Sequence, residues 1–249
     1  MSARVYVITY HAIGGDGGVL ATPPEVLRAQ LTAWRDAGIR FLRLDEFESH
    51  LAGTLKLDAN ALLLTFDDGL LSVYTEAFPI MRELGIPGTL FLVSDTMGGD
   101  NRFPGQPAWV PTLPIMTWEQ AKEMAAGGFD IGSHTRHHPP LADVSVTSDL
   151  QDEVGGAAEL LAKQIGRPMT AFAYPYGSLN AAVREAVGKH HRVAFSTVMG
   201  PVVPGDDPLL VKRIDAFYLQ APAVYARVFT TAGRAYLAGR AMARRLRGH

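Results

Sequence analysis

Cysteine is absent from this chain of 249 residues. Without cysteine the protein cannot form a disulfide scaffold, a cysteine-based zinc site or a catalytic thiol. Any metal site must therefore take its ligands from histidine, aspartate and glutamate side chains.

The chain also lacks a strong charge imbalance and any long apolar run. Lys and Arg number 23 against 25 Asp and Glu, so the net charge of −2 gives no reason to expect a nucleic acid partner. No apolar stretch approaches the ~20 residues that span a bilayer, so we expect no stable membrane insertion. The apolar run of about six residues near the N-terminus is too short for the core of a secretion signal. We therefore expect a cytoplasmic protein.

What is present is a regular alternation of strand-like and helix-like segments. The strand-like runs are too apolar to leave one face in water, which predicts a parallel sheet covered by helices. Seven or eight such units in a single domain over residues 1–249 fit a closed or nearly closed barrel; an open doubly wound sheet is the alternative. The expected strands are 4–10, 41–44, 61–66, 88–93, 129–133, 169–174, 193–197 and 209–214. The expected helices are 23–37, 45–51, 70–84, 147–165 and the segment between the cap Thr117 and Gly127.

Two segments stand apart from this alternation. Residues 97–116, rich in glycine and proline, form one long loop, and a loop of that length is usually functional. Its Trp109 is either a stacking surface for a sugar ring or a loop anchor. Residues 221–249 carry six arginines and no acidic residue, and should be helical. We interpret this segment as a solvated basic face; the alternative is a weak contact with an anionic membrane surface or a phosphorylated substrate.

Polar residues gather at the ends of four expected strands. Tyr10-His11 ends the first strand, and the others end in the segments 65–69 (TFDDG), 133–138 (SHTRHH) and 174–177 (YPYG). In parallel α/β folds the carboxyl ends of the strands meet at one face and carry the functional groups. We therefore expect all four clusters to surround one mouth.

The histidines have the spacing of metal ligands. His134 and His138 are four residues apart, which on one helical turn would put both rings on the same side. Two histidines and one carboxylate make a site with three ligands and room for water and substrate. His137 is a competing ligand, and a turn with exposed histidines is the structural alternative.

The two carboxylates of Asp67 and Asp68 can serve two different roles, one as a metal ligand and one as a general base. A single helix cap explains one carboxylate but not two. Adjacent side chains on a strand diverge, so one can bind a metal while the other faces a water on that metal. A divalent ion lowers the pKa of bound water, and a nearby carboxylate then serves as general base.

These segments resemble a known family. TFDDG (65–69), HTRHH (134–138) and FAYPYG (172–177) are similar, in order, to the first three motifs of the polysaccharide deacetylases, carbohydrate esterase family 4 with the NodB-homology fold. Tyr10-His11 and the late KRID (212–215) point to the branch that begins with a YHxI motif. The resemblance covers roughly residues 5 to 215. It implies a distorted (β/α) barrel with seven or eight strands and a bound divalent metal, zinc in most members and cobalt as the other choice.

The resemblance also implies roles for individual residues. Asp68, His134 and His138 would bind the metal, and Asp67 would be the general base. The backbone N–H near Tyr176 would help to stabilise the oxyanion. Acetate and a free amine would leave.

Two family features have no match at their usual place. The third motif usually brings an arginine that orients the base, but Ala173 stands there; Arg213 is the better substitute and Arg136 the poorer. The last motif usually brings a histidine as general acid, and the chain offers only the terminal His249 after Asp215. We take His11 as the best candidate to protonate the leaving amine.

Three functions remain open at this point. The first is a metal-dependent N-deacetylase acting on an N-acetylated amino sugar in a polysaccharide, an oligosaccharide or a glycan precursor. The second is a deformylase or another amidase acting on a nucleotide- or lipid-linked sugar or a small metabolite. The third is a sugar-binding protein without turnover, motivated by the missing arginine and histidine. The sequence leaves the oligomeric state open.

Overall fold

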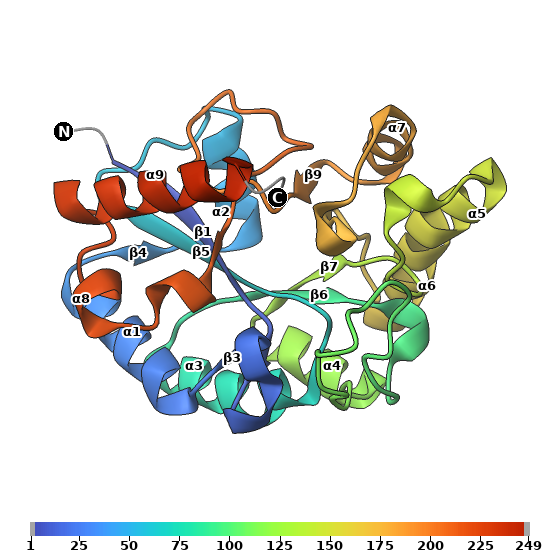
Figure 1. Ribbon diagram of the computed structural model, residues 1–249, viewed down its shortest axis with the longest axis horizontal. Helices are drawn as coiled ribbons and strands as arrows, with labels where there is room; N and C mark the ends of the chain where they lie inside the picture. The colour runs from blue at the N-terminus through green and yellow to red at the C-terminus, as the bar shows by residue number, and fades with distance from the viewer. Residues whose placement is uncertain (1–2, 247–249) are drawn as a thin grey trace.

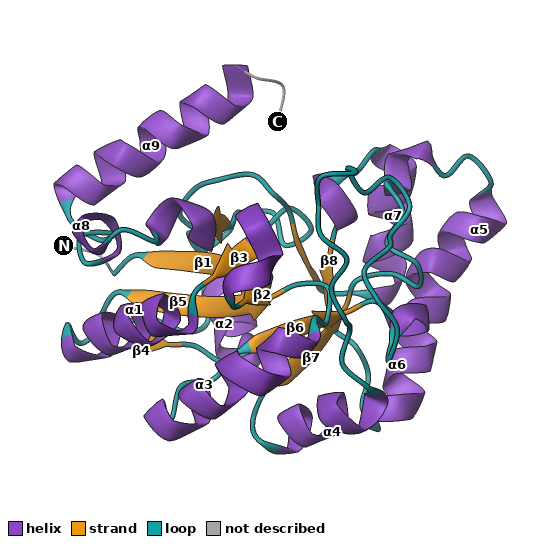
Figure 2. Cartoon of the chain, turned by 60° about the horizontal axis from the view of Figure 1, so that its bottom comes forward, coloured by secondary structure: helices purple, strands orange, loops and turns teal. Residues whose placement is uncertain are grey.

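A computed structural model describes residues 3–246, which form an eight-stranded parallel sheet curled into a distorted barrel (Figures 1 and 2). The strand order is β10-β1-β5-β6-β7-β8-β9, with β4 paired to the start of β5, and a small β2-β3 pair lies outside the sheet. The strands are β1 Val5–Tyr10, β2 Ala12–Ile13, β3 Ala21–Thr22, β4 Arg40–Phe41, β5 Ala61–Phe66, β6 Thr89–Leu92, β7 Asp130–Ser133, β8 Ala171–Ala173, β9 Val193–Phe195 and β10 Ile214–Asp215.

This topology confirms the expected barrel and excludes the alternative, an open doubly wound sheet. From β5 to β9 the strands follow one another around the sheet in chain order, so no point exists at which the order reverses. A doubly wound sheet requires such a reversal, where its ligand binds. The central strands β1 and β5 are completely buried, as their apolar sequences predict, because the sheet is covered on both sides.

Helices surround the sheet (Figure 1). They are α1 Pro24–Asp36, α2 Leu44–Leu51, α3 Phe78–Leu84, α4 Trp118–Ala126, α5 Thr147–Gln151, α6 Ala157–Ile165, α7 Ala181–His190, α8 Pro222–Tyr225 and α9 Thr231–Leu246. The expected cap of α4 is present, since the Thr117 hydroxyl accepts the Gln120 N–H and the Gln120 side chain accepts the Thr117 N–H.

Two expected helices are interrupted by π-helical turns, at Val73–Ala77 before α3 and at Asp152–Gly156 between α5 and α6. Pro79 lies in the first turn of α3 and has no N–H to donate to the preceding turn. The backbone hydrogen bonds of the helix are therefore rearranged into a π-helical turn there. In the second case the His190 ring lies 2.6 Å from the position that a Cβ on Gly155 would occupy. Glycine therefore lets α7 approach this turn closely.

The last expected strand, 209–214, is wrong in its extent. Only Ile214–Asp215 pairs with β1, and the preceding segment touches β9 through a single bridge between Phe195 and Val211. The chain passes here from one edge of the curled sheet to the other. It cannot remain in register with both edges, so the regular strand is short and the barrel closes only loosely.

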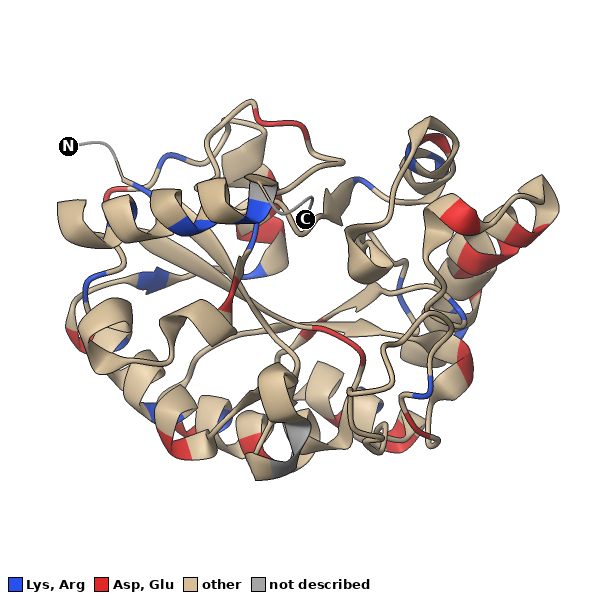
Figure 3. Cartoon of the chain, viewed as in Figure 1, with Lys and Arg blue, Asp and Glu red and all other residues tan. Residues whose placement is uncertain are grey.

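The C-terminal segment contains α8 and α9, and residues 247–249, including His249, lie outside the described residues. Figure 3 shows α9 with basic and without acidic residues. No helix within residues 3–246 is long and apolar enough to cross a membrane.

His191, directly after α7, is buried in a way that predicts acid sensitivity. Its side chain packs on Phe172, and within the described chain neither ring nitrogen has a hydrogen-bond partner. Burial, with a smaller effect of His190, lowers the pKa of His191 from 6.5 to about 4. The unfolded state therefore binds the extra proton first as the pH falls below 6.5, and the folded state loses stability.

We expect His191→Leu to remove this loss. Between about pH 7.5 and about pH 5, wild type should lose about 2 kcal/mol of unfolding free energy because of this histidine, as the linkage of protonation to folding requires. The variant should not show this loss. Urea unfolding at both pH values measures the difference. His190→Gln, at the exposed neighbouring position, is the control and should change the pH dependence far less. Equal acid sensitivity of wild type and His191→Leu would show that this ring titrates freely in the folded state.

Candidate active site

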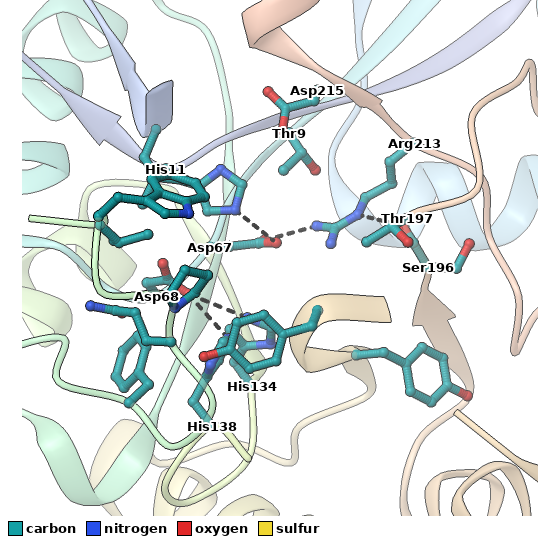
Figure 4. Close-up of a pocket in the computed structure, with 18 of the residues that line it drawn as sticks. Thr9, His11, Asp67, Asp68, His134, His138, Ser196, Thr197, Arg213 and Asp215 are labelled. Atoms are coloured by element: carbon teal, nitrogen blue, oxygen red, sulfur yellow. Dashed lines mark hydrogen bonds and ion pairs between the residues drawn. The ribbon is translucent and has the colours of Figure 1, made fainter. Parts of the chain in front are cut away.

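The four polar strand ends meet in one cavity of about 330 Å³, as the sequence predicts (Figure 4). It opens at the carboxyl ends of β1, β5, β7 and β8, where parallel barrels carry their functional groups. All of the predicted site residues line it: His11, Asp67, Asp68, His134, His138, Tyr176 and Arg213.

Asp68, His134 and His138 form a compact buried triad. The Asp68 Oδ1 atom lies 3.5 Å from the Nε2 atom of each histidine, and the two Nε2 atoms lie 3.1 Å apart. Ligands about 2.0–2.1 Å from a tetrahedral zinc ion would be about 3.3 Å from one another. The three side chains thus have the spacing and the chemistry of a divalent metal site.

The histidine rings are oriented for ligation. The His134 Nδ1–H donates to the Ala173 carbonyl over 2.8 Å, which leaves the lone pair of Nε2 facing Asp68 and His138. Burial, followed by the neighbouring His134, lowers the pKa of His138 to about 3, so this ring is neutral at physiological pH. A neutral imidazole is the form that binds a metal.

The two histidines meet through a turn and not through a helix, which corrects the expectation of one helical turn. Thr135 has a φ of 70° and His138 a φ of 61°, both left-handed. The His138 N–H donates to the Thr135 hydroxyl over 2.9 Å, and this bond fixes the turn. A non-glycine residue in this conformation is strained, as is common at functional sites.

His137, the competing ligand, faces away from the triad. Its side chain is half exposed, with Nδ1 2.7 Å from Glu153 Oε1 and Nε2 3.5 Å from Asp95. The neighbouring Arg136 is bound by Asp95 and Asp152 in the same outer network. Arg136 is therefore held by other carboxylates and not by Asp67, which agrees with its being the poorer candidate in the sequence.

A comparison of two alanine variants tests the ligand assignment. We expect His134→Ala to lower the affinity for Zn²⁺ by at least about a hundredfold, because even indirect support of a ligand is worth about 10–100-fold. His137→Ala, in the same loop, should leave the affinity within about threefold of wild type. Competition with a chromogenic chelator measures both constants. Strong loss of metal in His137→Ala alone would reverse the assignment.

Asp67 faces a different partner. Its Oδ1 atom accepts a hydrogen bond from Arg213 over 2.8 Å, and its Oδ2 atom lies 4.0 Å from the His11 Nε2 (Figure 4). Arg213 is itself buried and donates its Nε–H to the Ser196 carbonyl. Burial alone would raise the pKa of Asp67, but the charge of Arg213, with His134 and His11, holds that pKa below its usual value.

The divergence of the two carboxylates comes from the backbone. Asp67 continues from β5, whereas Asp68 and Gly69 both have a φ of 72°. This turn aims Asp68 at the histidines and Asp67 at Arg213. A Cβ on Gly69 would lie 2.9 Å from a Leu92 methyl group, so only glycine fits the turn.

Tyr176 lies over the triad in a left-handed conformation, with a φ of 55°. Its ring packs 4.6 Å from the His138 ring, and its hydroxyl donates to the Pro104 carbonyl over 3.1 Å. Among the hydrogen bonds of residues 3–246, none uses the Tyr176 N–H. This group is thus available for a ligand, as the sequence expectation of an oxyanion donor requires.

The loop 97–116 rims the cavity, and besides the expected Trp109 it contributes residues that the sequence did not single out. Phe103 packs on the outer face of His138, with 4.4 Å between ring centroids. Buried Asn101 holds the loop together, since its side chain bonds the Leu113 N–H and the Pro111 carbonyl. Trp109 lines the mouth and is 67% exposed. For the contacts of Phe103 and Asn101, the only sequence signal was the length and the glycine- and proline-rich composition of the loop.

Comparison with known proteins agrees with this site. Residues 55–194 match a family model described as polysaccharide deacetylase. YxkH of Bacillus subtilis (strain 168) is 27% identical over 187 residues, which are 75% of this chain and 62% of that protein. The matched region is therefore less than two thirds of that relative.

Two further proteins extend the comparison. The poly-beta-1,6-N-acetyl-D-glucosamine N-deacetylase of Staphylococcus epidermidis is 27% identical over 206 residues, 78% of this chain and 68% of that protein. The solved structure of IcaB from Ammonifex degensii has a TM-score of 0.80 and 27% identity, and the match covers 94% of this chain and 98% of that one. Since the family model spans more than half of the sequence, the chain belongs to the polysaccharide deacetylase family.

Proposed function

We propose that this protein is a divalent-metal-dependent hydrolase that removes the N-acetyl group from an N-acetylated amino sugar of a polysaccharide or oligosaccharide and releases acetate. The observation that carries the proposal is the cavity in which the Asp68–His134–His138 triad lies beside the Asp67–Arg213 pair. A metal site and an adjacent base are the two parts that amide hydrolysis requires.

Zinc is the metal that this triad fits best, with cobalt second. Two imidazole nitrogens and one carboxylate oxygen are the borderline ligands that zinc accepts, and three protein ligands leave a position open for chemistry. A zinc ion supplies a Lewis acid toward the acyl oxygen and lowers the pKa of water at the site.

The residues of the chain divide the proton transfers among them. Asp67 accepts a proton from the attacking water, while Arg213 keeps this carboxylate ionised and fixed in place. The Tyr176 N–H donates to the oxygen that becomes negative as water adds to the carbonyl. His11 donates a proton to the departing nitrogen as the C–N bond breaks. The products are acetate and a free amine.

For the substrate we propose a β-1,6-linked N-acetylglucosamine chain. One curated relative, from Staphylococcus epidermidis, is named for that polymer. The cavity of about 330 Å³ is at the small end of ligand pockets, so it holds one sugar residue while the rest of a chain crosses the mouth. Trp109 and Tyr176, both exposed at the mouth, offer aromatic faces to sugar rings.

The other functions receive less support. A pure binding protein has no need for a buried, ionised Asp67 that Arg213 holds beside the metal-binding triad. A deformylase or another amidase would use the same residues, so only the choice of acyl group and substrate separates it from an N-deacetylase. The cytoplasmic location expected from the sequence stays a prediction.

The experiment is a measurement of product release with the zinc-loaded full chain. Oligomers of β-1,6-linked N-acetylglucosamine, the β-1,4-linked isomers and N-formyl analogues are compared by acetate or formate release. We expect the β-1,6-linked acetylated oligomers to give the highest kcat/KM. Formate release that exceeds acetate release would favour the deformylase. No release from any substrate, with zinc bound at one equivalent, would reject an enzymatic function for this chain.

A further inference from the structure

Among the described residues of α9, the exposed side chains carry almost no charge. Apart from Arg240, the residues of α9 that the structure describes as exposed are uncharged: Thr231, Ala232, Ala235, Tyr236, Ala238, Gly239, Met242, Ala243 and Leu246. Met242 and Leu246 are 65% and 80% exposed. An exposed helix normally turns its charged residues to water. Among the described exposed residues of α9 only Arg240 is charged, so the solvated basic face stays a prediction from the sequence.

An apolar groove continues this surface beneath the helix. The groove, of about 670 Å³, lies between α9 and the edge of the sheet, with Tyr6, Met199 and Leu237 on its walls. Met242 and Leu246 line it as well, so the exposed apolar surface and the groove are one surface. Figure 2 shows α9 at the outside of the molecule, next to α8, and its Leu237 is buried against the rest of the chain.

The charge around the groove has one sign. Arg4 and Arg234 line it, and no acidic residue is among its described lining residues. After Asp215 the sequence contains no Asp or Glu at all. Two copies of α9 packed face to face would bring arginines together without an acidic partner. An anionic surface complements both the apolar stripe and the flanking arginines.

We propose that α9 is a contact for the surface of a membrane that contains anionic lipids. The Met242–Leu246 side lies at the boundary between head groups and acyl chains, and Arg4 and Arg234 face the lipid phosphates. Arg244, on the same helix, lines the active-site cavity. The contact therefore holds the mouth of the cavity close to the membrane surface.

Flotation with lipid vesicles tests the proposal on the full chain. We expect binding to vesicles of phosphatidylglycerol and phosphatidylcholine, little binding to phosphatidylcholine alone, and release as salt is raised. The double variant Met242→Ser/Leu246→Ser should bind the anionic vesicles about tenfold more weakly, since burial of apolar groups supplies part of the affinity. Val146→Ser is the matched control, because Val146 is 51% exposed next to α5, at the far end of the molecule from α9 (Figure 1).

A second pair of variants tests the charges. Arg4→Gln/Arg234→Gln should reduce binding to anionic vesicles, while Lys56→Gln/Lys122→Gln, which removes two exposed charges elsewhere, should not. The Met242 and Leu246 side chains are exposed, so circular dichroism and activity of Met242→Ser/Leu246→Ser without vesicles should match wild type. Equal binding to both kinds of vesicle, or none, overturns the proposal. So does a dimer, seen by light scattering, that Met242→Ser/Leu246→Ser dissociates while vesicle binding stays the same.

Discussion

Asp67→Asn is expected to lower kcat by about a thousandfold, within the range that a positioned general base contributes. The amide oxygen of asparagine can still accept the hydrogen bond of Arg213, so the arrangement of the site is kept. An amide cannot take a proton from water, so only proton transfer is lost. Acetate release measured at saturating substrate, together with zinc content, separates this loss of chemistry from loss of metal.

The control for this variant is Asp58→Asn, an exposed position just before β5. It should leave kcat, KM and zinc content unchanged. Asp67→Asn should keep one equivalent of zinc, because the ligands are other residues. Its unfolding free energy should fall by about 1–3 kcal/mol, the usual cost of weakening a buried hydrogen bond to a charge. If Asp67→Asn kept a third or more of the activity, another group would be the base.

Arg213→Met is expected to damage both stability and activity. It leaves the Asp67 carboxylate buried without its nearest cation, and removing one partner of a buried ion pair costs about 3–5 kcal/mol. Arg213 is also the largest influence that keeps the pKa of Asp67 low against the effect of burial. Without it this pKa rises, and the base becomes protonated at a higher pH than in wild type.

Two pH dependences follow with a definite sign. The acidic limb of kcat/KM should move to higher pH in Arg213→Met. The loss of stability should be largest near neutral pH, where the unpaired carboxylate must be charged, and should shrink on acidification as Asp67 takes up a proton. Unfolding by urea across this pH range, and pH profiles of acetate release, measure the two effects.

Further variants distinguish positioning of the base from a general loss of fold. Arg213→Lys keeps the charge but loses the donor to the Ser196 carbonyl. Compared with Arg213→Met, it should therefore bring the pH profile back toward that of wild type more fully than it restores kcat. The double variant Asp67→Asn/Arg213→Met should be less destabilised than the sum of its single variants, because neither charge is left unpaired. A destabilisation that is simply additive, with an unshifted pH profile, would show that Arg213 does not act through Asp67.

The sequence by itself determined which side chains could bind a metal and the edge of the sheet at which they meet. The lack of cysteine left His, Asp and Glu as ligands, and the apolar strands ending in TFDDG and SHTRHH placed them at one edge of a parallel sheet. This reasoning works because strand ends obey a simple rule: the carboxyl ends of parallel strands lie together. The family model covers residues 55–194, which include these motifs.

The residues outside that range were harder to assign. His11 and Arg213 lie outside the residues that the family model matches, and Arg213 is separated from Asp67 by 146 positions in the chain. Their approach depends on how the sheet curls and on the passage of the 209–213 segment from β9 to β1. The sequence could name them as candidates, but only the fold brings the Arg213 guanidinium within 2.8 Å of the Asp67 carboxylate.

The tertiary structure also decided between neighbours that the sequence could not separate. His137 and His138 are adjacent, and the left-handed conformations of Thr135 and His138 turn one ring outward and the other inward. The composition of α9 predicted a basic helix, and its packing decided that most of its described exposed residues are small or apolar. Composition and spacing fix which side chains are available in each segment. The direction in which each one points depends on backbone torsions and packing partners far away in the chain.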